Sequence, residues 1–465
     1  MSKPPLSRLA LCSVLPLSLL ACNDPAPPPS PAEVRSAIST DLGNVLHQSG
    51  GALSGGADAL PGTAALTMLA HLLGTPDVLP VQAMTARLLG DDGAPVIDGD
   101  KQTSYLNDQL FTDANHVGDG IFQIPPSLLC KRTVTDASGM HDSVDAACVE
   151  QATKVDLRIR TASEDGALVF ALQVDAQHDE PLRLTLTHTS VALTVDLDGA
   201  QHAFVALAAI AGTDAPNVAL AGAVTAKLEA LGTSKAKISF AIDRALSIRA
   251  AKAGVDLAGP DAFALSSPKA DVVSLTLDGA AKTGALAVGL GRTELNVPGS
   301  DGEPRTDVVL AGLALHTVFA AGQPFALTDV SLGNGTTFIA RDGKRAVSLD
   351  VNFGSPFDVT VTHDDTAGTS TLAVSPSLDV QLAVDHAVLG DDAPVYDVTE
   401  LKLAGSVRGR DDSDQLEVVT GSLAIKTNPA SFGFSAAAGQ CVTGSDASDP
   451  TTGAPFTQWA VGACL

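Results

Sequence analysis

Residues 182–198 read LRLTLTHTSVALTVDLD, and this stretch decides the fold class. It holds two runs, 182–187 and 191–198, in which every second residue is leucine or valine. A period of two places the apolar side chains on one face of a β-strand and the polar side chains on the other. The stretch therefore predicts two neighbouring strands, each with one buried face and one face in water.

The same alternation continues toward the end of the chain. It returns at residues 155–159, 238–242, 273–277, 347–353, 357–361, 378–384, 401–407 and 423–425. Turn dipeptides, which supply the positive φ angles of tight hairpins, stand at Asp165-Gly166, Asp198-Gly199, Asp278-Gly279, Asp301-Gly302, Asn334-Gly335 and Asp342-Gly343. We therefore expect a mainly β body over residues 151–465, a long antiparallel meander that forms a curled sheet, a sandwich or two β modules. The helical spacing of Val224, Leu228 and Leu231 predicts one interruption at residues 218–231.

A different pattern precedes the strands. Val34, Ile38, Leu42 and Val45 recur at intervals of three and four, and similar spacing continues to residue 89, which predicts three short helices. Residues 90–141 are dense in aspartate, glycine and asparagine and have no sustained period, so we expect loops there. Residues 33–150 thus form a small helical and loop-rich cap ahead of the β-rich body.

The first residues have the outline of an export signal. A basic start with Lys3 and Arg8 leads into the apolar run 9–21, whereas a helix needs about 20 apolar residues to span a membrane. The run ends in Leu19-Leu20-Ala21-Cys22, which resembles the lipobox of bacterial lipoproteins. The resemblance covers residues 1–22 alone. It implies that residues 1–21 are a signal peptide and that the thiol of Cys22 carries a diacylglycerol, which anchors the chain to a membrane.

The residues after Cys22 bear on where the chain is held. In enteric lipoproteins an aspartate directly after the cysteine retains the protein at the inner membrane, and here that position is Asn23. The resemblance therefore implies a lipid-anchored protein of the cell envelope, at the outer membrane in preference to the inner one. Residues 22–32 are rich in proline, which predicts an extended tether of about 3.1 Å per residue.

Charge restricts the partners that the chain can have. The whole chain has 28 basic and 53 acidic side chains, and loss of Lys3 and Arg8 with the signal leaves a net charge of 26 − 53 = −27. Nucleic-acid binding needs a basic footprint, so we expect no nucleic-acid partner. An acidic body is also repelled by anionic headgroups, so membrane contact is expected through the lipid anchor.

Four cysteines remain once Cys12 and Cys22 are set aside. An even number in an exported chain predicts disulfides, and three pairings are open to Cys130, Cys148, Cys441 and Cys464. The shortest loops join Cys130 to Cys148 and Cys441 to Cys464, and we predict those two bridges. A zinc site is disfavoured because the chain has no C-x-x-C spacing.

Short catalytic signatures are missing. The chain has no G-x-S-x-G, H-E-x-x-H or P-loop motif, so we expect no catalytic residue, no cofactor and no enzyme. The acidic loops at residues 91–145 leave two alternatives open. Carboxylates in glycine-rich loops suit Ca²⁺, for which Asp91, Asp92, Asp98 and Asp100 are candidates, but the EF-hand order is missing and a solvated acidic loop is the alternative.

Three hypotheses of function follow. The first is a non-enzymatic envelope lipoprotein that binds another envelope component or has a structural role, with the cap and its acidic loops as the contact region. The second is a carrier of lipid or another apolar ligand in a β-lined groove, because a curled sheet with an aliphatic core can leave such a groove. The third is an enzyme that uses the acidic loops at residues 91–145.

Overall fold

The computed structural model describes most of the chain from residue 27 onward. The described residues are 27–57, 103, 106–136, 139–144, 146–174, 180–211, 217–299, 305–321, 323, 325–342, 345–364, 366–385, 397–410, 413–428, 432–448 and 455–464.

A helical arm opens the described chain. It consists of α1 (Pro31–Ala37), the π-helical turn η2 (Ile38–Leu42) and α2 (Gly43–Ala57). Ser30 and Glu33 form a capping box at its start, with Pro31 at the first helical position, so the first N–H groups are satisfied. Val34, Ile38 and Leu42 are buried, which confirms the predicted helical face. The other helices predicted up to residue 89 lie outside the described residues.

Short elements connect the helical arm to the main sheet. They are β1 (His116–Gly118), β2 (Ile121–Gln123), α6 (Pro126–Leu129), β3 (Lys131–Asp136), β4 (Gly139–Val144) and α7 (Ala146–Ala152). The strands β3 and β4 form a separate hairpin. The strand β2 pairs with β5, so β1 and β2 form one end of the main sheet.

The main sheet contains 24 of the described strands, and every pairing in it is antiparallel. Its first part is β5 (Leu157–Glu164), β6 (Ala167–Val174), β7 (Leu182–Leu186), β8 (Ser190–Asp196), the helix α8 (Leu197–Ala211), β9 (Val218–Ala230) and β10 (Lys235–Ala250). The middle part is β11 (Phe263–Ser267), β12 (Ala270–Asp278), β13 (Thr283–Leu290), β14 (Thr293–Val297), β15 (Arg305–Leu310), β16 (Leu313–Ala320), β17 (Phe325–Leu332), β18 (Thr336–Asp342), β19 (Arg345–Phe353) and β20 (Phe357–Asp364). The last part is β21 (Thr369–Asp385), β22 (Asp397–Arg410), β23 (Ser413–Asn428), β24 (Phe434–Ala437), β25 (Gln440–Ser448) and β26 (Pro455–Ala463). This long meander confirms the predicted fold class, and the sheet is a single curled one.

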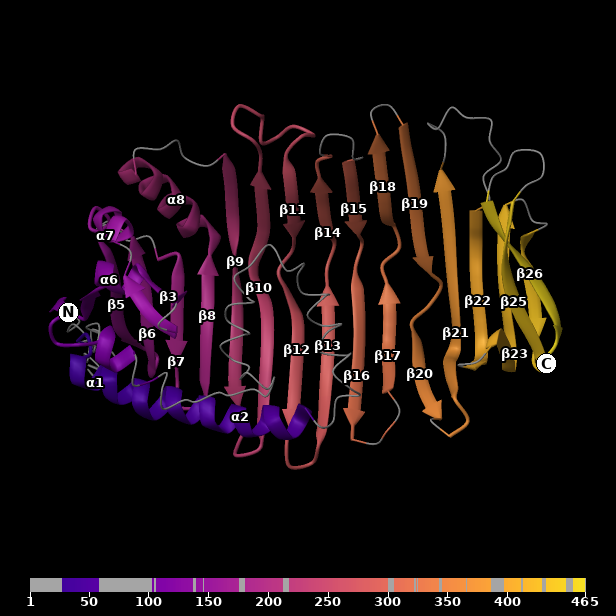
Figure 1. Cartoon of the computed structure of the whole chain (residues 1–465), viewed down its shortest axis with the longest axis horizontal. Coiled ribbons are helices and arrows are strands. Elements are labelled where there is room, and N and C mark those ends of the chain that lie inside the picture. Colours follow the sequence, from indigo (N-terminus) through magenta and orange to yellow (C-terminus); the bar gives the residue numbers. More distant parts are fainter. Residues whose placement is uncertain are drawn as a thin grey trace, which may run out of the picture.

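The middle of the sheet consists of strands that lie end to end in pairs (Figure 1). The two halves of β10 pair separately with β11 and β12, and the two halves of β21 pair separately with β19 and β20. Between them, β13 continues into β14, β15 into β16, and β17 into β18. The chain therefore crosses the full height of the sheet in each pass, with a short break near the middle.

The breaks follow one another across the sheet, and we call this line the crease. It is formed by Gly222, Pro268, Gly291, Gly312, Gly333, Gly354, Pro376, Gly405 and Gly421. Proline cannot donate to the ladder, and bulges and glycines bend a strand where they interrupt it. The register shifts of β9 against β10 and of β21 against β22 lie on the same line.

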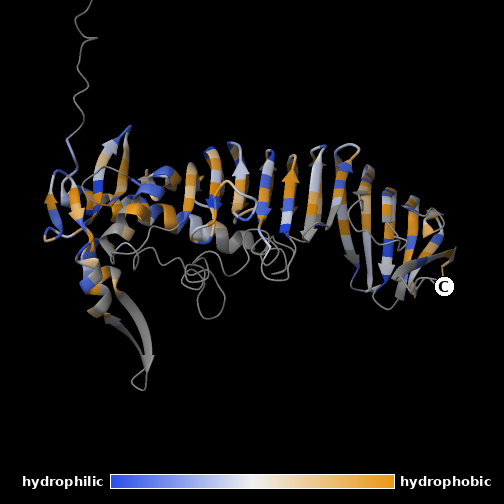
Figure 2. Cartoon of the chain, turned by 90° about the horizontal axis from the view of Figure 1, so that it is seen from above, coloured by the Kyte–Doolittle hydropathy of each residue, from blue (hydrophilic) through white to orange (hydrophobic). Residues whose placement is uncertain are grey.

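Seen along its strands, the sheet is an arch whose two ends turn to the same side (Figure 2). One end carries the helical arm, which packs with β5 to β8 in a core that includes Ile38, Phe122 and Phe170. At the other end, β20 to β26 enclose a second core around Phe357, Val418 and other apolar residues. Within the described part of the chain, two packed ends therefore flank a middle that α2 contacts at β9, β10 and β12.

The structure corrects two secondary-structure predictions. Residues 218–231 are not a helix, because β9 pairs along most of its length with β8 or β10. Val224 and Leu228 fit both a helical period and a strand period, and cross-strand pairing decided between them. The strand predicted at residues 191–198 ends at Asp196, and the helix α8, which begins at Leu197, was not predicted. Its alanine-rich sequence was the available signal.

The turn dipeptides have mixed outcomes. Asp165-Gly166 joins β5 to β6 with both φ angles positive, and Asp278-Gly279 begins the connection from β12 to β13, as predicted. Asp198-Gly199 instead lies in the first turn of α8. Asn334-Gly335 lies on the crease between β17 and β18, which continue one another and do not form a hairpin. Asp301-Gly302 and Gly343 lie outside the described residues.

Candidate apolar binding face

One face of the sheet is apolar along its whole length, and we call it the apolar face. Cross-strand partners from β9 to β21 show this continuity, because neighbours in a ladder project to the same side. One such row is Leu228, Ile238, Leu275, Leu286, Thr317, Leu327, Val359 and Val374. The hydroxyl of Thr317, the one polar member of this row, donates to the carbonyl oxygen of Ala326. The row therefore presents hydrocarbon and no free polar group.

Among the described residues, the apolar face is covered at its ends and partly open between them. The first part of the helical arm covers β5 to β8, and α2 continues along β9, β10 and β12. The C-terminal strands enclose the face near β20 to β26. In the middle, large apolar side chains keep 38% of their surface exposed, as at Ile238, Phe240 and Val361. Apolar surface in such a contiguous arrangement is characteristic of a binding site.

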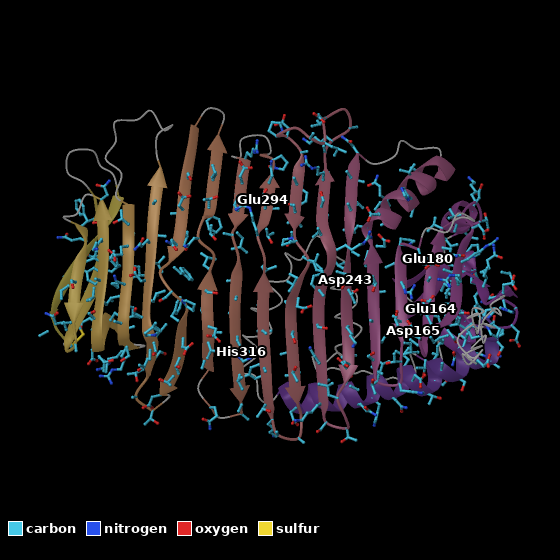
Figure 3. All side chains as sticks on the ribbon, turned by 180° about the vertical axis from the view of Figure 1, so that it is seen from behind. Glu164, Asp165, Glu180, Asp243, Glu294 and His316 are labelled. Atoms are coloured by element: carbon cyan, nitrogen blue, oxygen red, sulfur yellow. A yellow bond between two sulfur atoms is a disulfide. The ribbon has the colours of Figure 1, made fainter. Side chains whose placement is uncertain are left out.

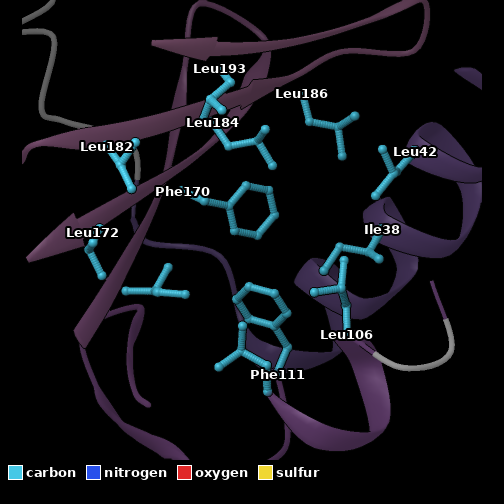
Figure 4. A pocket seen from close by; sticks show the side chains of 12 residues that line it. Ile38, Leu42, Leu106, Phe111, Phe170, Leu172, Leu182, Leu184, Leu186 and Leu193 are labelled. Atoms are coloured by element: carbon cyan, nitrogen blue, oxygen red, sulfur yellow. The ribbon is translucent and has the colours of Figure 1, made fainter. Parts of the chain in front are cut away.

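A pocket lies under the helical arm, at the β5 end of the apolar face (Figure 4). Its volume is about 260 Å³, and all twelve lining residues are apolar: Ile38, Leu42, Leu106, Leu110, Phe111, Ile159, Phe170, Leu172, Leu182, Leu184, Leu186 and Leu193. Ligand pockets begin at about 300 Å³. The pocket therefore fits one slender apolar group, not a bulky ligand.

The pocket opens onto the rest of the apolar face. Leu193 pairs with Ala226, Ala226 pairs with Phe240, and Phe240 pairs with Val273, so the pocket wall continues directly into the open middle. Leu193 itself is 39% exposed, whereas Leu186, deeper under the arm, is 1% exposed. An elongated apolar molecule could thus lie with one end in the pocket and its length on the sheet.

The opposite face of the sheet has ion pairs and hydroxyl groups, and Glu164, Glu180 and Asp243, labelled in Figure 3, are among its side chains. Arg160 donates to both carboxylate oxygens of Glu180, and Arg408 pairs with Glu417 across β22 and β23. Hydroxyls are paired in the same way, as between Thr194 and Thr225 at 2.7 Å. These partly buried pairs satisfy the charged and hydroxyl groups of this face, and ion pairs near a surface typically contribute about 0 to 1 kcal/mol each.

The titratable groups with resolved pKa shifts all favour their charged forms. The ammonium groups of Lys426 and Lys402 lower the pKa of Glu400. The N–H of Ala281 and then Lys235 lower the pKa of Asp278. Hydrogen bonding to Glu180 raises the pKa of Arg160. Such shifts are typical of ion pairs on a surface, and none of them prepares a carboxylic acid for proton transfer near neutral pH.

The predicted site residues are only partly within the described residues. Cys441 and Cys464 form a disulfide, which confirms that bridge. Cys130 is also disulfide-bonded, while the side chain of its predicted partner Cys148 lies outside those described. Cys22 and the calcium candidates Asp91, Asp92, Asp98 and Asp100 are likewise outside the described residues. Among the residues that are described, no three His, Cys, Asp or Glu side chains are grouped so as to hold a metal ion.

Sequence reasoning found the apolar strand faces but not the pocket. The lining residues in β5 to β8 follow from the period of two. Leu106, Leu110 and Phe111 fall in a segment expected to be loop, and nothing local indicates that they close a cavity against Phe170. That arrangement depends on packing between segments about 60 residues apart in sequence.

Within the described part of the chain, no helix is long and apolar enough to cross a membrane. No family model, no curated protein and no solved structure matches the chain.

Proposed function

We propose that this chain is a non-catalytic lipid carrier of the bacterial envelope, which binds acyl chains along its apolar face and is itself anchored by lipid on Cys22. The observation that supports this most directly is the continuity of the apolar face from the pocket through Phe240 to Val273. A globular protein normally buries such a face against a second layer. In the part of the chain that the structure describes, the middle of the face stays partly open, which suits a removable occupant.

The lining and the shape of the pocket favour binding of a ligand over catalysis. The pocket lining contains no polar residue that could act as a nucleophile, acid or base. Its shape is narrow, and it is followed by a long apolar path, which fits a hydrocarbon chain better than a compact ligand. In the alternative, an envelope protein binds the acidic loops at residues 91–145. Residues 91–102 of these loops lie outside the described residues, and in the described part Asp113 is paired with Arg35.

The test is lipid binding by a chain that starts at Asn23, which retains every described residue. A 16-carbon fatty acid with a terminal fluorophore serves as the probe. We expect saturable binding, with fluorescence that indicates an apolar environment. Phe240→Glu places a charge on the open middle and should weaken binding, because a carboxylate beside an acyl chain would be desolvated.

A matched variant separates binding from general damage. Val318 lies on the polar face and is 58% exposed, so Val318→Glu should leave binding unchanged. Phe240→Leu keeps the site apolar and should retain binding. Circular dichroism must show the same sheet content in all three variants. Equal loss of binding in Phe240→Glu and Val318→Glu, or no binding by the parent chain, would refute the carrier.

A further inference from the structure

The chain enters the fold beside the pocket. Pro29 is buried and Ser30 caps α1, so the path is fixed from about residue 28 onward. A Cβ atom added to Gly120 would lie 2.8 Å from Cβ of Pro28 and 2.7 Å from the carbonyl oxygen of Thr161. Pro28 therefore packs over Gly120 and against the strand β5.

That contact is close to the wall of the pocket. Thr161 is two residues from Ile159 on β5, a separation of about 7 Å, and its cross-strand partner is Phe170. Ile159 and Phe170 both line the pocket. The point at which the chain leaves the folded body is thus one strand repeat from the cavity.

The remaining tether is short. Pro28 is six positions after Cys22, and a fully extended chain spans at most about 20 Å over six steps. The tether expected over residues 22–32 is shortened at its far end, because Pro29 is buried and α1 begins at Pro31. A lipid on Cys22 would consequently hold this end of the sheet near the bilayer surface.

The two ends of the apolar face differ in how they are closed. At the pocket, Leu182 and Leu193 remain 37% and 39% exposed. At the far end, Val418 is fully buried in a core that Phe434 and Trp459 help to cover, and the Cys441–Cys464 bridge ties β25 to the residue that follows β26. Access at the anchored end is therefore easier than at the C-terminal end.

We propose that the pocket is the loading end of the apolar face and takes an acyl chain of a phospholipid from the bilayer that holds Cys22. This inference rests on the proposed function and adds the source and the point of entry. The short tether keeps the pocket within reach of the membrane, and the apolar face then leads the acyl chain away toward β19.

The experiment uses the full-length, membrane-anchored chain in vesicles of phosphatidylethanolamine and phosphatidylglycerol. Part of the phospholipid carries a diazirine at the end of one acyl chain, and crosslinked peptides are identified by mass spectrometry after irradiation. We expect crosslinks at residues 182–193. A second chain carries an insertion of 20 glycine and serine residues after Asp24, and the larger reach of this tether, about 25 Å on average, should reduce those crosslinks. Its binding of the fluorescent fatty acid in solution should not change.

The outcomes separate this inference from the proposed function. Crosslinks at Phe240 and Val361 without any at residues 182–193 would overturn the loading end and leave the carrier intact. A diazirine placed instead in the lipid on Cys22 tests whether the pocket holds the protein's own anchor; labelling of the pocket by that chain alone would also overturn the inference. An unmodified Cys22 in the mass spectrum would remove its basis. No crosslink anywhere, together with no fatty-acid binding, would reject both proposals.

Discussion

Single glycines on the crease determine how closely the strands can approach. Gly421 has φ +74°, and a Cβ atom added there would lie 1.9 Å from the carbonyl oxygen of Ala404. The neighbouring strand presents Gly405, its ladder partner, at the same point. Both strain and contact therefore require glycine at residue 421.

We expect Gly421→Ala to lower the free energy of unfolding by about 1 to 3 kcal/mol or more, the range for a non-glycine residue held in the left-handed region. Gly409→Ala is the matched control on β22, since nothing lies within 4 Å of its added Cβ atom and its φ is not in the positive range. Urea unfolding followed by circular dichroism measures both. Equal stability of the two variants would show that the close approach at the crease is not needed.

The pKa of Glu400 leads to a second prediction at the scale of one residue, on how stability depends on pH. Hydrogen bonds and charge from Lys426 and Lys402 hold its pKa below the ordinary value of 4.5. A carboxyl whose pKa is lowered on folding stabilises the fold above its unfolded pKa, and this contribution is lost as the pH falls through the folded pKa. Acidification should therefore lower the thermal midpoint of the parent chain.

Glu400→Gln should be less stable than the parent at about pH 6, and the difference should shrink as the pH falls through the folded pKa of Glu400. Glu150→Gln, a change at an exposed glutamate of α7, is the control. Thermal melts at a series of pH values from 6 downward measure this. A constant gap between Glu400→Gln and the parent would contradict the assignment.

At the scale of elements, the hairpin of β25 and β26 depends on its disulfide. Cys441 and Cys464 are 23 residues apart in sequence, and closing a loop of that length stabilises a fold by about 3 kcal/mol in the chain-entropy model. The bridge also holds β26 where Trp459 packs against Phe434, with ring centroids 5.1 Å apart.

Cys464→Ser paired with Cys441→Ser should therefore expose Trp459. We expect a red shift of its emission and faster proteolysis after residue 448, while the rest of the sheet keeps its circular dichroism. Trp459 is the only tryptophan, so the emission reports on this hairpin alone. An unchanged emission spectrum would mean that packing on Phe434 holds β26 without the bridge.

The strands and helices also show how much of the fold the sequence predicts. The strands at residues 182–186 and 273–277 were predicted because one face is buried while the other is polar, and the period of two records that directly. The helix α8 and the strand β9 were exchanged because alanine suits either environment. The pocket was not predictable, since it requires residues 106–111 to pack on β6. A deletion of residues 90–127 would therefore not test the acidic loops alone, because it would also remove Phe111 and Phe122 from a buried core.

At the scale of the whole molecule, Cys22→Ser should release the protein from the membrane fraction. None of the described helices could replace the anchor, and the net charge of −25 for the whole chain opposes adsorption to anionic lipid. Fractionation followed by partitioning into a detergent phase measures the change. A serine variant that partitions like the parent would show that a different segment holds the protein.

The middle of the sheet, with its end-to-end strands, is long in the direction across the strands. From β9 to β23 the sheet advances by nine inter-strand steps, counting each end-to-end pair as one strand. At about 4.8 Å a step, that is a path of roughly 43 Å, measured before any curvature. The hydrocarbon core of a bilayer is about 30 Å thick. The sheet is therefore an elongated surface and not a closed container, and its path is longer than the hydrocarbon core of a bilayer is thick.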